Sequence, residues 1–247
     1  MWTELHCLCE KLNVDDILSR CRSNPEELME RDDHNLTPLH ILCLAPMIPF
    51  DVVHDMIEVN PTILKERDTH GETPLHICLR NRNVDLKVVK LLIEHCPEAL
   101  EITNKEGMMP LHVALRYNSK HDMAKDLIRL LVKSYPRALT HHVKMGYPSA
   151  AKDSLCQEPS HFIADPKFSR CIHEIELKYH DADIQIRDGA YPIHIALHKG
   201  APYDVIEVLV AENPETKTFV DKFGLKPWDI AKERHLEQEM LDLLKMN

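Results

Sequence analysis

Aromatic residues and glycine are both scarce in this sequence of 247 residues. Phe, Trp and Tyr together make up 5%, and there are six Gly. A β-sandwich or barrel would normally use more of both, in its strands and in its turns. Apolar residues nevertheless reach 44% and charged residues 28%, which is typical of a folded chain and not of a disordered one. We therefore expect helices built mainly from Leu, Ile, Val and Ala.

The sequence also lacks the features typical of nucleic-acid-binding, membrane-spanning and secreted proteins. Asp and Glu number 40 against 30 Lys and Arg, and the net charge of −10 argues against a nucleic-acid binder. The longest stretch without an acidic or basic residue, 34–50, is broken by three prolines and cannot span a bilayer. The first residues lack the pattern of a signal peptide, and the eight Cys lack regular short spacing. We expect a protein of the cytoplasm, or of the nucleus, with reduced thiols and no membrane insertion.

One tetrapeptide recurs along the whole chain. Its first intact copy reads Thr37-Pro38-Leu39-His40, and further copies begin at residues 73, 109, 191 and 226. Degenerate copies begin at residues 3 and 147, so the spacings are 34, 36, 36, 38, 44 and 35. Proline fits the first turn of a helix, and a preceding threonine can cap that helix start. The chain is therefore predicted to be built from about seven similar units.

Turn residues recur in the same register as the tetrapeptide. Three residues before the proline, the chain has a residue that tolerates a positive φ, namely Asn35, Gly71, Gly107, Gly189 or Gly224. An Asp or Asn stands three residues earlier still in most units, where its side chain can brace a loop. A tight turn is therefore predicted before each of these helices.

These residues resemble the Thr-Pro-Leu-His signature of the ankyrin repeat family, whose unit is a β-turn followed by two antiparallel helices. The resemblance implies an all-α solenoid of stacked helix-turn-helix units with short hairpin loops. We expect a single domain over residues 1–247, with units starting near residues 3, 37, 73, 109, 147, 191 and 226. The units exceed the family's usual length of about 33 residues, and several second helices end in Pro, so longer loops are expected. The resemblance also implies that the motif histidines hydrogen-bond the backbone around the turn: His6, His40, His76, His112 and His194.

The fifth unit departs from the pattern. It spans 44 residues from Tyr147 to Tyr191, and we expect an inserted loop within 149–183. Such a departure marks either function or drift in a tolerant loop. The segment also contains Cys and His residues at spacings that match no common zinc motif, which favours buried Cys and surface His over a metal site. These residues are Cys156, His161, Cys171, His173 and His180.

The common catalytic motifs do not occur in this sequence. It lacks Gly-x-Ser-x-Gly, His-Glu-x-x-His, a phosphate-binding Gly-rich loop and a redox Cys-x-x-Cys. We therefore predict a protein that is not an enzyme and that has no cofactor and no metal. The alternative in this class is an enzymatic or metal-dependent activity centred on the fifth unit.

The resemblance also predicts where a partner binds. Ankyrin partners contact the hairpin tips and the exposed side of the first helices, which form a concave face, so an adaptor that binds a protein or peptide is the expected function. Arg and Tyr are typical of binding hot spots, and the arginines favour an acidic partner. The alternative is that these bases only keep an exposed helix soluble. The predicted contact residues are Glu72, Arg80, Arg82, Met108, Arg116, Tyr117, His198 and Lys199.

A structural scaffold or spacer is a second class of function. The first unit is expected to expose Leu5, Cys7 and Leu8, and these side chains could stack on another molecule in self-association. The chain could also be one domain of a longer protein, because Met1 leads directly into a repeat. For the partner-binding class, we expect Arg80→Glu combined with Arg116→Glu to weaken binding without unfolding the protein.

Overall fold

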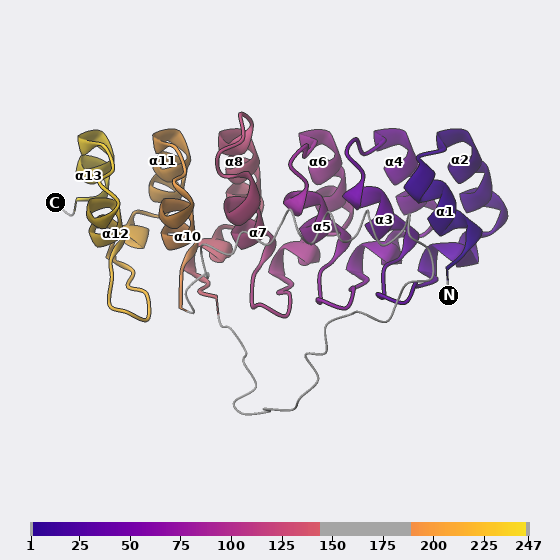
Figure 1. Ribbon diagram of the computed structural model, residues 1–247, viewed down its shortest axis with the longest axis horizontal. Helices are drawn as coiled ribbons and strands as arrows, with labels where there is room; N and C mark the ends of the chain where they lie inside the picture. Colours follow the sequence, from indigo (N-terminus) through magenta and orange to yellow (C-terminus); the bar gives the residue numbers. More distant parts are fainter. Residues whose placement is uncertain (1, 144–188, 246–247) are drawn as a thin grey trace, which may run out of the picture. The chain divides into compact units, whose positions relative to one another are not determined.

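The computed structural model describes residues 2–143 and 189–245, and these belong to one structural unit. They form twelve α-helices and five 3-10 helices and contain no strand, which confirms the all-α solenoid in the described residues. The helices stand in pairs, side by side in one row (Figure 1). The first helices of the pairs are α1 (Glu4–Lys11), α3 (Pro38–Leu44), α5 (Pro74–Arg80), α7 (Pro110–Asn118), α10 (Pro192–Lys199) and α12 (Pro227–Glu233). The second helices are α2 (Val14–Ser23), α4 (Phe50–Val59), α6 (Leu86–His95), α8 (Ala124–Ser134), α11 (Tyr203–Glu212) and α13 (Gln238–Leu244).

The recurrent proline begins the first helix of most pairs. In α3, Pro38 is the first helical residue, and Thr37 before it is extended, with φ −85° and ψ 165°. Proline is well tolerated there because the N–H groups of the first turn have no acceptor within the helix. The backbone N–H of Thr37 donates to Nδ1 of His40 at 3.1 Å, and the Thr37 hydroxyl lies 2.8 Å from the same nitrogen. The helix start is therefore capped through the histidine ring.

The motif histidines also join each repeat to the next. Because Nδ1 accepts a hydrogen bond, Nε2 carries the hydrogen, and in His6, His40, His76 and His112 it lies within hydrogen-bonding distance of a backbone carbonyl further along the chain. The Nε2–O distance is 3.1 Å for His6, 3.2 Å for His40 and 3.2 Å for His76. The Nδ1 bond is repeated in His112 and His194. The structural role predicted for these five histidines is confirmed.

The hairpin tips share one geometry. In the tip before α5, Oδ1 of Asp68 accepts from the backbone N–H groups of His70 and Glu72, each at 2.8 Å. Gly71 has a φ of +73°, and Asn35 has a φ of +63° in the preceding tip. A side chain with a Cβ costs about 1–2 kcal/mol in this left-handed conformation. This cost explains why Gly or Asn recurs there, and the predicted tight turns are confirmed.

The prolines that end the second helices begin the 3-10 helices. Pro97, for example, opens such a helix, in which Ala99 and Leu100 are buried. The sequence predicts longer loops here, whereas the additional residues of each unit form compact turns that bury apolar side chains. The 3-10 helices are η1 (Pro25–Met29), η2 (Pro61–Lys65), η3 (Pro97–Glu101), η4 (Pro136–Thr140) and η5 (Pro214–Thr218).

The described residues on either side of the gap, Val143 and Gly189, are joined by backbone hydrogen bonds. Val143 N–H donates to the carbonyl of Ala190 at 2.9 Å, and Gly189 N–H donates to that of Val143 at 2.7 Å, the same two bonds that close the other tips. Directly across this junction α7 packs against α10 and α8 against α11, with an ion pair between Lys125 and Glu207 at 3.7 Å. The described residues thus form six pairs in one row.

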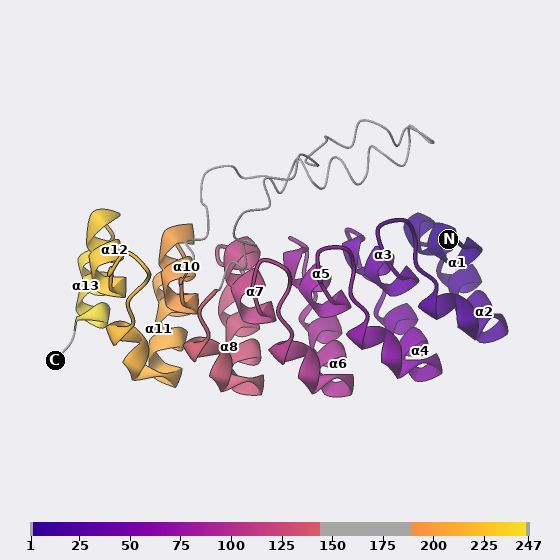
Figure 2. The ribbon, with the colours of Figure 1, turned by 90° about the horizontal axis from the view of Figure 1, so that it is seen from below.

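The predicted irregular unit near residue 147, with its loop at 149–183, lies almost entirely outside the described residues. The expectation of that unit, and of a single domain over residues 1–247, therefore stays a prediction. Within the described part, the first helices form one layer and the second helices the other (Figure 2). We call the side formed by the first helices and the hairpin tips the first-helix face.

Candidate partner-binding face

Two arginines and a tyrosine from neighbouring repeats meet on the first-helix face. Arg80 ends α5, while Arg116 and Tyr117 lie in the last turn of α7. The Cζ atoms of Arg80 and Arg116 lie 5.4 Å and 5.3 Å from the centre of the Tyr117 ring. Cation–π contacts of this kind contribute about 0.5–1 kcal/mol at exposed sites. The tyrosine ring is therefore in contact with guanidinium groups from two neighbouring repeats.

Arg80 is paired with a buried acid of its own repeat. Its Nη1 atom lies 2.7 Å from Oε2 of Glu72, whose side chain is only 4% exposed. Nδ2 of Asn104 donates to the other carboxylate oxygen at 3.2 Å. Burial by itself would raise the pKa of Glu72, but the charge and the hydrogen bond of Arg80 keep this pKa below its usual value. Glu72 is therefore ionised at neutral pH and compensated within the protein.

Arg116 is paired with an acid at the next hairpin tip. Its Nη1 atom lies 2.6 Å from Oε2 of Glu106, whose side chain is 52% exposed, and 3.7 Å from the sulfur of Met108. An exposed ion pair contributes about 0–1 kcal/mol, so this one orients Arg116 more than it stabilises the fold. We call this set the arginine–tyrosine cluster: Glu72, Arg80, Glu106, Arg116 and Tyr117. Its two acids balance its two bases.

Two of the predicted contact residues are not accessible at the tips. Met108 is 1% exposed and Glu72 is 3% exposed, so neither side chain is open to solvent. Each follows the glycine of its tip, and each contacts the arginine at the end of the following first helix. The closed hairpin directs the side chain after its glycine inward, and the sequence pattern alone does not reveal this direction.

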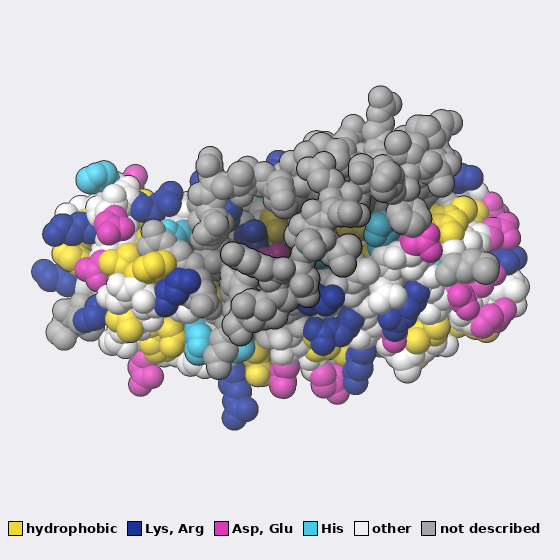
Figure 3. Space-filling view, turned by 60° about the horizontal axis from the view of Figure 1, so that its bottom comes forward, with side chains coloured by type: hydrophobic (Ala, Val, Ile, Leu, Met, Phe, Trp, Pro, Cys, Tyr) yellow, Lys and Arg dark blue, Asp and Glu magenta, His cyan; other side chains and the backbone are white. Residues whose placement is uncertain are grey.

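The contacts above join five of the eight predicted residues, and three remain. Arg82 follows α5 and is exposed, whereas His198 and Lys199 are half-buried in the last turn of α10. Charged side chains of both signs lie along the array in the space-filling view (Figure 3). As partner contacts, all eight residues stay predictions.

Sequence reasoning missed two residues of this site, Asn104 and Glu106. Both belong to the hairpin tip before α7, and they hold Glu72 and Arg116 in place. A signal for the acids is present in the sequence, because the two repeats whose first helix ends in an arginine also have a glutamate beside the tip glycine. These glutamates are Glu72, directly after Gly71, and Glu106, directly before Gly107.

In residues 2–143 and 189–245, no group of three or more His, Cys, Asp or Glu side chains is placed to hold a metal ion. Burial raises the pKa of Cys21 to about 11 and that of Cys78 to about 12, so these thiols are protonated packing groups. The Cys and His residues considered for zinc lie outside the described residues: Cys156, His161, Cys171, His173 and His180.

The described helices differ from a membrane span, because a helix that crosses a bilayer must be both long and apolar. None of them combines the length and the apolar character that crossing a bilayer requires.

Known proteins resemble this chain in fold. A family model of ankyrin repeats, in three copies, matches residues 47–138. A chain in the structure of a predatory endopeptidase from Bdellovibrio bacteriovorus in complex with an immunity protein has a TM-score of 0.64 and 16% identity, covering 98% of this chain and 97% of that chain. An ankyrin repeat domain from Acinetobacter baumannii has a TM-score of 0.61 and 14% identity, with 97% and 95% covered. No curated protein sequence matches the chain.

Proposed function

Because the chain carries ankyrin repeats, we propose that it is an adaptor that binds a protein or peptide on its first-helix face and catalyses no reaction. Ankyrin repeats are protein–protein interaction modules and are generally not enzymes. One structurally similar chain comes from a complex of an endopeptidase with an immunity protein, which is in keeping with partner binding. The observation that carries the proposal is the arginine–tyrosine cluster, which places hot-spot residue types from two repeats around one ring.

The charges of the arginine–tyrosine cluster indicate which kind of partner would fit this face. Arg80 and Arg116 already have carboxylate partners, so an acid on the partner would have to displace one of them. Arg82, in the turn after α5, and Lys105, at the hairpin tip before α7, are both exposed. We therefore propose a partner that sets an apolar or aromatic side chain against Tyr117 and directs its acidic residues toward Arg82 and Lys105.

The combined reversal of Arg80 and Arg116 is a poor test of this face. Arg80→Glu would set a second acid beside buried Glu72, and breaking a buried pair by removing one partner costs about 3–5 kcal/mol. We therefore expect the double variant to lose stability, so that weaker binding would have two causes. Tyr117→Ala leaves both ion pairs in place and is the sharper change.

The matched control for Tyr117→Ala is Tyr135→Ala. Both tyrosines are half-buried, but Tyr135 directly follows α8 in the layer of second helices. With both variants shown to be folded by circular dichroism, recovery of the partner from a cell extract should fall at least about tenfold for Tyr117→Ala, as expected for the loss of a hot spot. It should stay unchanged for Tyr135→Ala. Equal recovery by the two variants would contradict the proposed face.

A scaffold that self-associates through its first unit is the second candidate function. Leu5, one of the residues expected to be exposed for such a contact, is instead fully buried, while Cys7 and Leu8 are half-buried. The apolar surface at this end is therefore smaller than the sequence indicated. Light scattering over a range of concentrations separates the two candidates, because self-association requires a mass that rises with concentration.

A further inference from the structure

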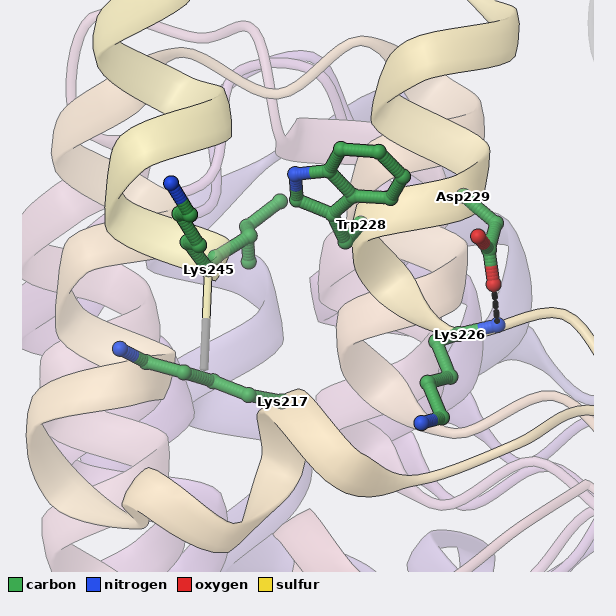
Figure 4. A pocket seen from close by; sticks show the side chains of 6 residues that line it. Lys217, Lys226, Trp228, Asp229 and Lys245 are labelled. Carbon is green, nitrogen blue, oxygen red and sulfur yellow. Dashed lines mark hydrogen bonds between the residues drawn. The ribbon is translucent and has the colours of Figure 1, made fainter. Parts of the chain in front are cut away.

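A cavity lies at α12, next to α13 and η5 (Figure 4). Its volume of about 360 Å³ falls within the range of about 300–1,000 Å³ that is typical of small-molecule sites. The cavity is separate from the arginine–tyrosine cluster, which is formed by α5, α7 and two hairpin tips. Its lining residues are Lys217, Lys226, Trp228, Asp229, Leu244 and Lys245.

Lysines dominate the charge of this cavity. Lys217 comes from η5, Lys226 directly precedes α12, and Lys245 directly follows α13, so lysines from three separate segments line the cavity. Among the described residues, the ion pairs leave all three without an acidic partner, although the chain as a whole has a net charge of −10. Like charges gathered in this way repel one another, and a bound anion would relieve that repulsion.

The single acid of the cavity already has a structural role. Oδ2 of Asp229 accepts the backbone N–H of Lys226 at 2.9 Å, the bond that the motif histidine makes in the other repeats. In the view of Figure 4, Lys217 and Lys245 lie on one side of Trp228, and Lys226 and Asp229 on the other. Lys226 and Asp229 balance each other in charge, so the excess of positive charge lies on the side of Lys217 and Lys245.

The rest of the lining is apolar. Trp228 stands where the other described repeats have Leu or Ile, and its indole is half-exposed, with Nζ of Lys232 5.0 Å from the ring centre. Leu244 is buried beside the same cavity. An aromatic and an aliphatic side chain therefore offer a surface on which the organic part of a ligand can rest.

We propose that this cavity binds a small organic phosphate, with its phosphate groups among the three lysines and its apolar part against Trp228 and Leu244. Lysine is a compact point charge that binds phosphate without a required orientation, whereas carboxylates are matched best by the paired N–H groups of arginine. No arginine lines the cavity. A folded segment of another protein would need a larger surface than the six lining residues provide.

The test uses the Trp2→Phe variant, because Trp228 is then the remaining tryptophan and its fluorescence reports on the cavity. The probes are ATP, inorganic tripolyphosphate and adenosine, at physiological salt. We expect saturable changes of emission with ATP and with tripolyphosphate, tighter binding of ATP than of tripolyphosphate, and a far weaker response to adenosine. The absence of ATP binding, or an equal response to adenosine, would overturn the proposal.

Two triple variants with the same change of charge provide the control. One replaces the cavity lysines, Lys217→Gln, Lys226→Gln and Lys245→Gln, and the other replaces exposed lysines of α6 and α8, Lys87→Gln, Lys90→Gln and Lys133→Gln. The first should weaken ATP binding at least about 100-fold, because each charged hydrogen bond contributes about 1.5 kcal/mol or more. The second triple variant should change the affinity for ATP less than about threefold. Equal losses of affinity in both triple variants would show that ATP is attracted only by the net charge of the protein.

The folding of these variants and the source of the phosphate are tested separately. Circular dichroism should show unchanged helix content, and the single variant Lys245→Gln, at an exposed position, should by itself weaken ATP binding about tenfold. If the triple variant loses helix content, the affinity of Lys245→Gln for ATP decides the proposal. Binding to vesicles that carry phosphoinositides, without any binding of soluble ATP or tripolyphosphate, would assign the site to a membrane surface and overturn the proposal.

Discussion

Lowering the pH from 7 to 5 acts on the motif histidines, which are buried and neutral in the folded chain. Burial lowers the pKa of His40, His76 and His194 to about 4 and that of His112 to about 3. Histidine in an unfolded chain has a pKa of about 6.5. Between these values the unfolded chain binds protons that the folded chain does not. The stability is therefore present above pH 6.5 and is lost as the pH falls toward 4.

The size of this loss of stability follows from the difference between pH 5 and the pKa of histidine in the unfolded chain. One pKa unit corresponds to about 1.4 kcal/mol, so each histidine lowers the free energy of unfolding by about 2 kcal/mol at pH 5. Four such residues together lower it by about 8 kcal/mol, which is comparable to the total stability of about 5–15 kcal/mol of a typical protein. Protonation of Nδ1 also removes the acceptor that caps each helix. We expect the array to unfold at least in part at pH 5.

Urea unfolding followed by circular dichroism at pH 7 and at pH 5 measures this loss. In His76→Asn the difference in unfolding free energy between the two pH values should shrink by about 2 kcal/mol, because one buried titrating group is gone. His70→Asn is the matched control, since His70 is an exposed residue at the tip of the same repeat. The argument would be refuted if the unfolding free energy of His76→Asn depended on pH as strongly as that of the unmodified chain. It would also be refuted if the unmodified chain were equally stable at both pH values.

Two further predictions concern stability. Asn118→Ala removes a buried amide that donates to a carbonyl oxygen of the preceding repeat at 2.6 Å. In urea unfolding, this change should lower the free energy of unfolding by about 1–3 kcal/mol, more than Asn83→Ala, which removes an exposed amide. Equal losses of stability in the two variants would contradict the role of Asn118. Gly71→Ala should destabilise the protein more than Gly224→Ala, although the two glycines have similar φ values. A Cβ at residue 71 would meet a backbone nitrogen at 3.3 Å, whereas a Cβ at residue 224 would meet nothing within 4 Å. The opposite order in thermal unfolding would contradict the expected crowding.

The repeating frame was predictable from the sequence because it depends on local backbone requirements. Proline at a helix start and glycine at a φ of +73° are conditions that few other residues meet, so their spacing reveals the units. The six described pairs appear where the motif copies at residues 37, 73, 109, 191 and 226 and the degenerate copy at Thr3 predict them. The 3-10 helices were missed because the same Pro that stops one helix can begin another.

The details of the candidate site depend on side-chain direction and were only partly predictable. The pairing of Arg80 with Glu72, and the burial of Met108, follow from a closed hairpin that turns these side chains toward a helix that begins later in the sequence. The junction of Val143 with Gly189 was missed for a related reason. It depends on packing of α7 against α10, a contact between segments far apart in the chain.

Protection of lysines in the complex with the partner tests the proposed first-helix face most directly. Lys105 is exposed at a hairpin tip of this face, and Lys90 is exposed on α6 in the other layer. Their reactivity toward an amine-labelling reagent is measured by mass spectrometry with and without the bound partner. The account predicts that the partner protects Lys105 and leaves Lys90 reactive. Protection of Lys90 with Lys105 unchanged would contradict it.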